Sequence, residues 1–142
     1  MATLVSFHAH PDDESIATGG AMRKAFEDGH RVVLVIATRG EHGEILTELN
    51  EGEELWERRV EETHAAAEIL GATRVEFLGY VDSGMVGDPL NDAPGSFWTA
   101  PVADAAEKLA AILREENADV LTIYDPYGTY GHPDHIQVHR VG

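Results

Sequence analysis

The sequence predicts an α/β fold, with a mostly parallel sheet flanked by helices. Four apolar stretches with the character of strands alternate with amphipathic stretches, an order typical of parallel strands joined by right-handed crossovers. Residues 32–36 (VVLVI) are apolar throughout, as expected of a central strand buried on both faces. Polar and acidic residues follow the strands, at the edge where open α/β sheets bind ligands.

The first half of the chain contains two of the expected strands and one long connection. We expect a strand over 4–7, a helix over 13–28 that Gly29 ends, and a strand over 31–37. The polar stretch over 38–54 is long for a simple connection, and such loops in compact domains are often functional.

The second half continues the alternation. Apolar residues recur three and four positions apart over 55–70, which predicts a helix that ends at Gly71. Pro101 suits the first turn of a further helix. The remaining expected elements are a strand over 74–78, a long loop over 79–99, a strand over 119–124 and a helix start at 132–135.

Length, composition and charge restrict the class of protein. A chain of 142 residues suits one domain, and the absence of cysteine means that any metal must be bound by histidine and carboxylate. The net charge of −16 argues against nucleic acid and anionic lipid as partners. No apolar run is long enough to span a bilayer and no signal peptide pattern opens the sequence, so we expect a cytoplasmic protein.

Two His-Pro-Asp clusters supply the residue types of a mononuclear metal site. Residues 8–14 (HAHPDDE) follow the first strand, and residues 132–135 (HPDH) follow the fourth. Because both clusters lie at carboxyl ends of strands, we expect them to share one edge of the sheet. His10, Asp13 and His135 would provide the nitrogen and oxygen ligands of catalytic zinc, and iron(II) or cobalt would also accept them.

The other members of the clusters suit acid–base roles. Asp12 would lie beside the metal without being needed as a ligand, as a general base for metal-bound water requires. His132 could stabilise an oxyanion or protonate a leaving amine, and Asp134 could accept the other ring N–H of a histidine. The alternative is that an Asp pair at a helix start is only a cap, but two matching clusters at one edge are more specific.

Further candidates lie outside the clusters. Arg59, on the second helix, could form a bidentate bond to a substrate oxygen, or it could simply pair with Glu62 one turn on. Glu44 follows the second strand, and contact with substrate hydroxyls and an exposed loop position are both open. His8 shares a strand face with His10, and we expect a supporting or core role for it rather than ligation.

These residues carry a resemblance to a known family. The segments 9–14 (AHPDDE) and 130–135 (YGHPDH) resemble the LmbE/PIG-L family of zinc-dependent N-acetylglucosaminyl deacetylases, and the similarity extends along essentially the whole chain. Arg59-x-x-Glu62 resembles the second helix of the family, and residues 82–85 (DSGM) resemble the loop of its mycothiol-pathway branch. The resemblance implies a Rossmann-like, three-layer α/β domain.

The resemblance also implies roles for individual residues. It implies zinc at His10, Asp13 and His135, zinc-bound water activated by Asp12, and de-N-acetylation of an N-acetylglucosaminide. It leaves open whether Asp12 or His132 is the general acid. The remaining implied residues are Tyr130, which polarises the carbonyl, Asp134 behind His132, and the substrate contacts Arg59, Asp82 and Glu44.

The partner implied is a small-molecule amino-sugar conjugate, and the sequence leaves its aglycone open. It also leaves open whether the chain forms a homo-oligomer. Family members similar to this one continue beyond the position of Gly142, so we expect 1–142 to be a single deacetylase domain without the family's C-terminal part. The alternatives are a non-catalytic metal- or sugar-binding fragment, an amidase on a thiol conjugate, and a nucleotide-binding domain. The last is disfavoured because no G-x-G-x-x-G follows the first strand.

Overall fold

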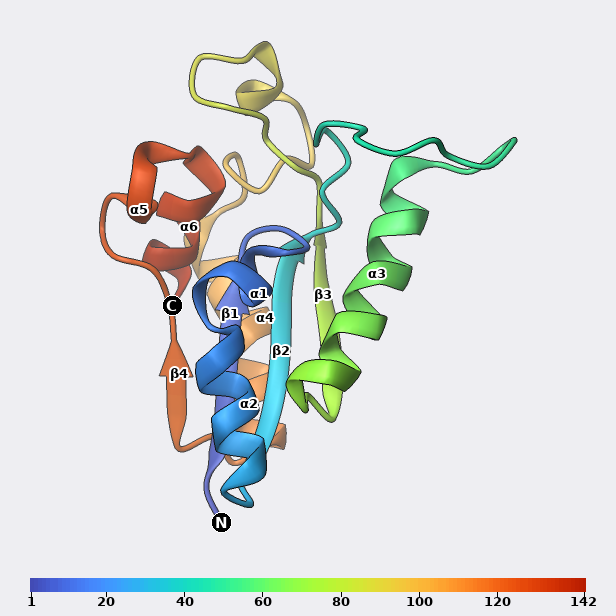
Figure 1. The fold of residues 1–142 in the computed structure, drawn as a ribbon. Helices are drawn as coiled ribbons and strands as arrows, with labels where there is room; N and C mark the ends of the chain where they lie inside the picture. The colour runs from blue at the N-terminus through green and yellow to red at the C-terminus, as the bar shows by residue number, and fades with distance from the viewer.

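A four-stranded parallel sheet forms the centre of the computed structural model, which describes residues 1–142 (Figure 1). The strand order is β3-β2-β1-β4, and Val5 of β1 lies opposite Val33 of β2 and Leu121 of β4. The predicted fold class is confirmed. The strands are β1 (Thr3–His8), β2 (Arg31–Thr38), β3 (Arg74–Tyr80) and β4 (Val120–Thr122).

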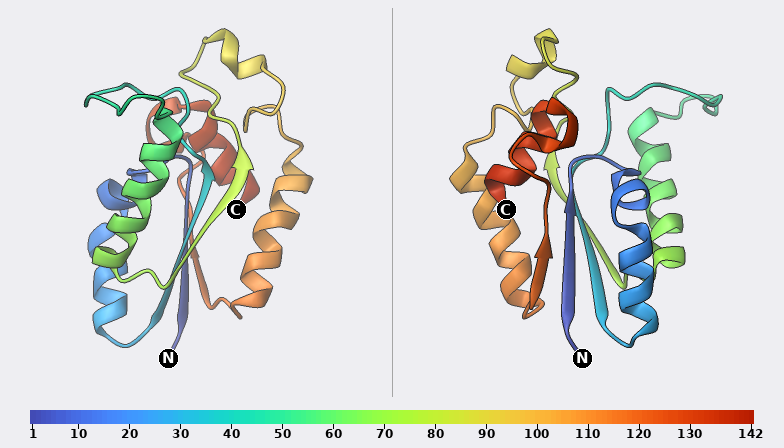
Figure 2. Two further views of the ribbon diagram at one scale, coloured as in Figure 1. Left: turned by 90° about the vertical axis from the view of Figure 1, so that its right-hand side faces the viewer. Right: turned by 60° about the vertical axis from the view of Figure 1, so that its left-hand side comes forward.

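Helices cover both faces of the sheet, which gives three layers (Figure 2). Val32, Leu34 and Ile36 of β2 pack in one apolar cluster with helices α2 and α3, whereas the alternate residues of β2 pack in a second cluster toward α4 and α6. The central strand is therefore buried on both faces, as its composition predicts. The helices are α1 (Asp13–Ala17), α2 (Gly19–Glu27), α3 (Leu55–Leu70), α4 (Val102–Glu115), α5 (Gly128–Gly131) and α6 (Pro133–Val141), with a 3₁₀ turn η1 (Pro89–Asp92).

Two elements differ from the sequence prediction. The single helix expected over 13–28 is two helices, because Thr18 leaves the helical conformation and its hydroxyl bonds to the carbonyl of Glu14 and to His8. Strand β4 is only three residues long, where the sequence predicts a strand over 119–124, and it pairs with β1 alone at the edge of the sheet. The predicted helix over 55–70 is confirmed as α3.

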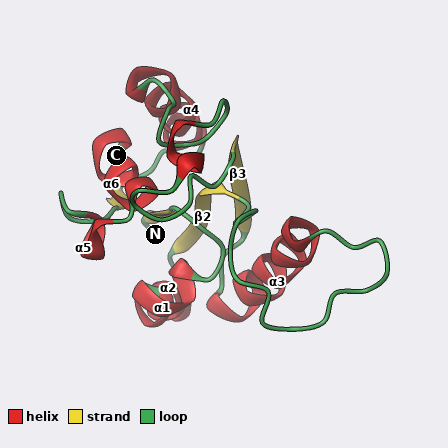
Figure 3. Cartoon of the chain, turned by 90° about the horizontal axis from the view of Figure 1, so that it is seen from above, coloured by secondary structure: helices red, strands yellow, loops and turns green.

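The carboxyl ends of all four strands point to one edge, where the long connections lie. Residues 39–54 form no helix or strand and extend away from the sheet beside α3, as the view from above shows (Figure 3). The segment between β3 and α4 and the short helix α5 lie over the same edge (Figure 1). None of the helices combines the length and the apolar character that a bilayer crossing requires.

Candidate metal centre and active site

The two His-Pro-Asp clusters meet at the carboxyl edge of the sheet. Nε2 of His10 lies 2.9 Å from Oδ2 of Asp134, although 124 positions separate the two residues. Nε2 of His135 lies 3.2 Å from Oδ2 of Asp13. The parallel strands β1 and β4, which are neighbours in the sheet, deliver these residues from their carboxyl ends.

A strained turn places the first cluster. Asp12 has a φ of 85°, in the left-handed region that few residues other than glycine enter. This conformation reverses the chain after β1 and lets Asp13 begin α1, where its Oδ2 accepts a hydrogen bond from the backbone N–H of His10. The side chain of Asp12 is 60 % exposed, so the strain presents its carboxylate to solvent beside buried neighbours.

The second cluster begins helix α6. Nδ1 of His132 accepts a hydrogen bond from the backbone N–H of Asp134 at 3.1 Å, so His132 caps the helix, and Pro133 occupies the first turn. A neutral His132 therefore carries its proton on Nε2. Burial, and then the positive charge of His10, lower the pKa of His132 to about 4, which keeps the ring neutral near pH 7.

Helix α5 packs directly against the second cluster because it begins with a glycine. Gly128 has a φ of 63°, and a Cβ there would lie 2.6 Å from Cβ of His135. No other residue type would allow this approach. The same short helix carries Tyr130, whose ring meets that of His135 edge-on at 4.9 Å between centroids.

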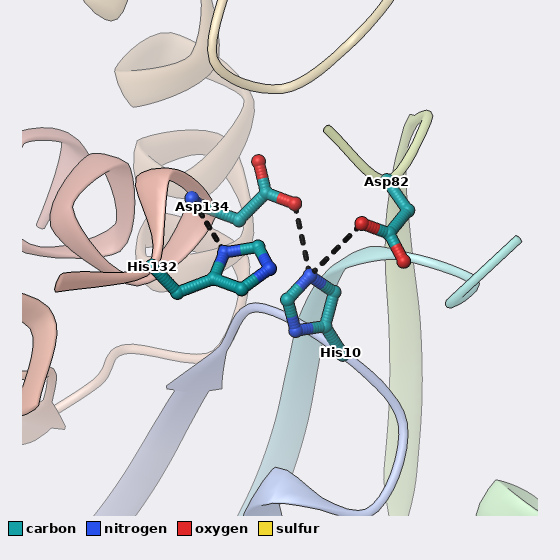
Figure 4. A group of neighbouring side chains, drawn as sticks. All are labelled: His10, Asp82, His132 and Asp134. Carbon is teal, nitrogen blue, oxygen red and sulfur yellow. Dashed lines mark hydrogen bonds and ion pairs between the residues drawn. The ribbon is translucent and has the colours of Figure 1, made fainter. Parts of the chain in front are cut away.

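Two groups of side chains have the composition of a cation site, and they share His10. One contains His10, Asp13 and His135; the other contains His10, Asp82, His132 and Asp134 (Figure 4). In the second group, Nε2 of His10 already lies 2.9 Å from Asp134 and 3.5 Å from Oδ1 of Asp82.

In the first group both imidazoles face one carboxylate oxygen, Oδ2 of Asp13. Nε2 of His135 lies 3.2 Å from it and Nδ1 of His10 lies 3.5 Å from it, and neither ring nitrogen of His135, both of them buried, makes a hydrogen bond. A buried imidazole without a hydrogen bond, beside a carboxylate and a second imidazole, fits a divalent cation, because two nitrogens and one oxygen form one of the common protein ligand sets of catalytic zinc. The residues present could therefore hold a metal ion.

His10 and the carboxylate of Asp13 in the first group strongly affect each other's pKa values. Burial alone would raise the pKa of Asp13, but its interactions with His10 and His135 hold that pKa far below its ordinary value. Burial would lower the pKa of His10, yet the nearby carboxylates of Asp13, Asp134 and Asp82 keep it well above the usual range. Asp13 is thus ionised, as metal binding requires, whereas His10 must release its Nδ1 proton for a cation to bind there.

The predicted substrate residues line one cavity above this centre. Its volume is about 360 Å³, and its walls come from both clusters and from the long loops. Glu44 is an exposed loop residue, whereas Asp82 is 6 % exposed and accepts a hydrogen bond from the backbone N–H of Gly84 at 2.9 Å. The lining includes Glu44, Arg59, Asp82, Tyr130 and His132.

Arg59 has a partner that the sequence did not suggest. Its Nη2 donates to Oδ2 of Asp12 at 2.9 Å and to the carbonyl of Pro11 at 2.5 Å, whereas Glu62 is 3.9 Å from its Nε. Burial raises the pKa of Asp12, and the Arg59 charge opposes that shift. Helix α3 therefore holds the carboxylate that lies beside the candidate metal ligands.

Sequence reasoning missed two residues in the site. The backbone N–H of Ser83 donates to Oδ2 of Asp134 at 3.0 Å, and the ring of Tyr124 stacks on that of His135. A backbone donor leaves no signal in the residue type, and Tyr124 has the appearance of a strand residue. The carboxylate of Asp134 accepts a hydrogen bond from the ring of His10, and its backbone N–H donates to Nδ1 of His132. His8 is buried and bonded to Tyr124, consistent with the supporting role expected of it.

Comparison with known proteins identifies the family. Residues 5–142 match the profile of the PIG-L family, described as GlcNAc-PI de-N-acetylase. The chain belongs to the PIG-L family. A 1D-myo-inositol 2-acetamido-2-deoxy-alpha-D-glucopyranoside deacetylase of Thermomonospora curvata is 49% identical over 97% of this chain and 50% of its own length. The protein of the same name from Acidothermus cellulolyticus is 46% identical over 99% of this chain and 52% of its own length.

Solved structures share the PIG-L fold of this chain. The N,N'-diacetylchitobiose deacetylase of Pyrococcus horikoshii has a TM-score of 0.77 and 28% identity, covering 98% of this chain and 47% of that chain. The 4-carboxy-2-hydroxymuconate hydratase of Pseudomonas putida has a TM-score of 0.71 and 30% identity, covering 99% and 54%. The chain spans about half the length of the curated relatives it matches, and a shared fold does not by itself fix the reaction.

Proposed function

We propose that this PIG-L chain hydrolyses the amide of an N-acyl amino sugar, by de-N-acetylation of a small-molecule N-acetylglucosaminide. The observation that carries the proposal is the buried imidazole of His135, which makes no hydrogen bond and lies beside Asp13 and His10. Asp12 is not part of this candidate ligand group, and it lines the polar cavity next to it. Relatives named as deacetylases of a glucosaminyl inositol support the same reaction.

We assign a divalent cation, with zinc as the first candidate, to His10, Asp13 and His135. His10 offers Nδ1, because Asp134 accepts the hydrogen bond from its Nε2 and so fixes the tautomer. When bound, the cation supplies polarisation of the amide carbonyl and a lower pKa for water. The donor set also suits iron(II) or cobalt.

Asp12 is the proton carrier in this proposal. Its carboxylate takes a proton from the attacking water, whose oxygen bonds to the amide carbon. The same proton then passes to the amide nitrogen as the carbon–nitrogen bond breaks. The other proton of the water leaves the new carboxyl group for the amine, so the products are acetate and the protonated amine. Arg59 orients the carboxylate through the 2.9 Å bond, which leaves the other oxygen of Asp12 for the transfer.

His132 stabilises the negative oxygen that forms during the attack. Its Nδ1 accepts from the backbone, so the neutral ring presents an N–H at Nε2, and the lowered pKa makes it a poor imidazolium acid near neutrality. We therefore assign the general acid role to Asp12 and the oxyanion role to His132. Tyr130, 6.1 Å from His132 between ring centroids, is the second donor.

The remaining cavity residues contact the sugar. Glu44 and Asp82 are hydrogen-bond acceptors for sugar hydroxyls, and Arg59 offers the guanidinium nitrogens that Asp12 does not occupy. A second candidate function is metal and sugar binding without turnover. The same geometry favours it, because the candidate ligands and the polar cavity that Glu44 and Asp82 line would suffice for binding alone.

Acetate release separates the two candidates. The purified chain, loaded with zinc, is assayed on N-acetylglucosaminides that carry inositol, malate or a second sugar, beside the Asp12→Asn variant. We expect acetate from at least one substrate and none from Asp12→Asn, with about one metal ion per chain in both proteins. Sugar binding without acetate release would support the second candidate, and equal activity in Asp12→Asn would remove Asp12 as the proton carrier.

A further inference from the structure

His135 lacks the support that the other candidate ligands have. Asp13 accepts from the backbone N–H of His10, and His10 is held by Asp134. A histidine that binds metal almost always donates its second ring N–H to a carboxylate, a carbonyl or water, which fixes the plane of the ring. His135 is 4 % exposed; its Nε2 faces Oδ2 of Asp13 at 3.2 Å, and its second ring nitrogen, Nδ1, has no hydrogen-bond partner.

An aromatic ring occupies the place of that support. The ring of Tyr124 stacks on the imidazole of His135, with 4.5 Å between centroids and 16° between planes. A near-parallel stack restricts rotation of the imidazole out of its plane, as a hydrogen bond to the second nitrogen would. Gly128 leaves no room for His135 to move away, because the backbone of α5 lies against its Cβ.

Tyr124 is itself anchored at both ends. Its hydroxyl lies 2.7 Å from Nδ1 of His8, and Nε2 of His8 lies 2.9 Å from both Ser6 Oγ and Thr18 Oγ1. Nδ1 of His139 lies 3.0 Å from the carbonyl oxygen of Tyr124. His139 is one turn after His135 on α6, so the same helix that carries the ligand holds the main chain of the stacked tyrosine.

We propose that Tyr124 is a positioning residue for His135, holding the imidazole in the plane that metal binding requires, and that the buried His8 is its anchor. The proposal rests on the metal site proposed above. It also accounts for a partly buried polar network, formed by Ser6, His8, Thr18 and Tyr124, that takes no part in the reaction steps. The break between α1 and α2 at Thr18 is part of this network.

Cobalt binding to the full chain tests the proposal without reference to activity. Cobalt(II) affinity is measured by competition with a chromophoric chelator, and the visible spectrum of the bound ion reports ligand geometry. Tyr124→Phe keeps the ring and removes the anchor, and Tyr124→Leu removes the stack. Phe26→Leu is the matched control, because this aromatic residue packs on Gly71, away from the site. His135→Ala defines the loss of a ligand.

We expect Tyr124→Leu to bind cobalt about 10–100-fold more weakly with an altered spectrum, and Tyr124→Phe to lie between it and the parent protein. Phe26→Leu should match the parent. Affinity within about twofold of the parent and an unchanged spectrum in Tyr124→Leu would overturn the proposal. If Tyr124→Leu does not fold, parental binding and spectrum in Tyr124→Phe would overturn it instead. A parent that binds no cobalt would overturn the metal site itself, a distinct result.

Discussion

Nε2 of His10 and Oδ2 of Asp134 lie 2.9 Å apart and join the start of the chain to its last helix. The contact decides which nitrogen of His10 remains for a metal, because Asp134 occupies the other one. Asp134 in turn accepts a hydrogen bond from the backbone N–H of Ser83, so the segment after β3 also helps to orient the imidazole of His10. Three segments of the chain therefore set the orientation of one candidate ligand.

Replacing Asp134 by Asn should weaken metal binding. Asn keeps the shape but removes the negative charge that makes His10 a stronger donor, so we expect about 10–100-fold lower zinc affinity in chelator competition. Asp104→Asn, an exposed change on α4, is the control and should bind zinc like the parent. Equal affinity in both variants would show that Asp134 does not support His10.

Arg59 and Arg58 form a matched pair on α3. Arg59 bonds to Asp12, whereas Arg58 bonds to Glu53 through two contacts of 2.7 Å. Arg59→Met should lower kcat at least about tenfold because Asp12 loses its orientation, while Arg58→Met leaves kcat within about twofold. Initial rates of acetate release over a range of substrate concentrations measure both. A rise in KM alone for Arg59→Met would assign Arg59 to substrate binding.

Glu14 should make the metal-free protein less stable as pH rises. Burial raises the pKa of Glu14 from 4.5 to about 7, so the folded state favours the protonated form. The stability that this proton contributes is complete below the unfolded pKa and is lost between that value and pH 7. Glu14→Gln should thus exceed the parent in stability by up to about 3 kcal/mol at about pH 8.

Urea unfolding at the two ends of this pH range measures the effect of Glu14. The difference between Glu14→Gln and the parent should be small near pH 4.5, the ordinary pKa of Glu, and grow with pH. Glu62→Gln, with a side chain 57% exposed, should show no such trend. A constant difference across the range would mean that Glu14 has an ordinary pKa in the folded protein.

Alanine substitutions at Gly128 and Gly52 distinguish the effect of a steric clash from that of backbone strain. Both have positive φ, 63° and 79°, but a Cβ at Gly128 meets His135 at 2.6 Å whereas a Cβ at Gly52 meets nothing within 4 Å. Gly52→Ala should cost about 1–2 kcal/mol of unfolding free energy and leave metal binding unchanged. Gly128→Ala should also displace His135 and abolish tight zinc binding. Parental zinc affinity in Gly128→Ala would contradict this packing.

The fold was largely predictable because its signals are local. The apolar run of β2 predicted a strand buried on both faces, and the periodicity of α3 predicted its bounds. The break at Thr18 was not predictable, because it depends on a hydrogen bond between the side chains of Thr18 and His8 across the α1–β1 contact. Helix periodicity continues through this residue, so the sequence pattern gives one helix where the structure has two.

The sequence by itself determined the class of the fold, the residue types of the site and the edge at which they lie, since strand ends and motifs are local features. Only the tertiary structure decided that Asp134 bonds to His10, that Arg59 bonds to Asp12 and that Tyr124 stacks on His135. These pairings join residues far apart in the chain. They follow from the packing of α3 and α6 against the sheet, a global property that no local pattern encodes.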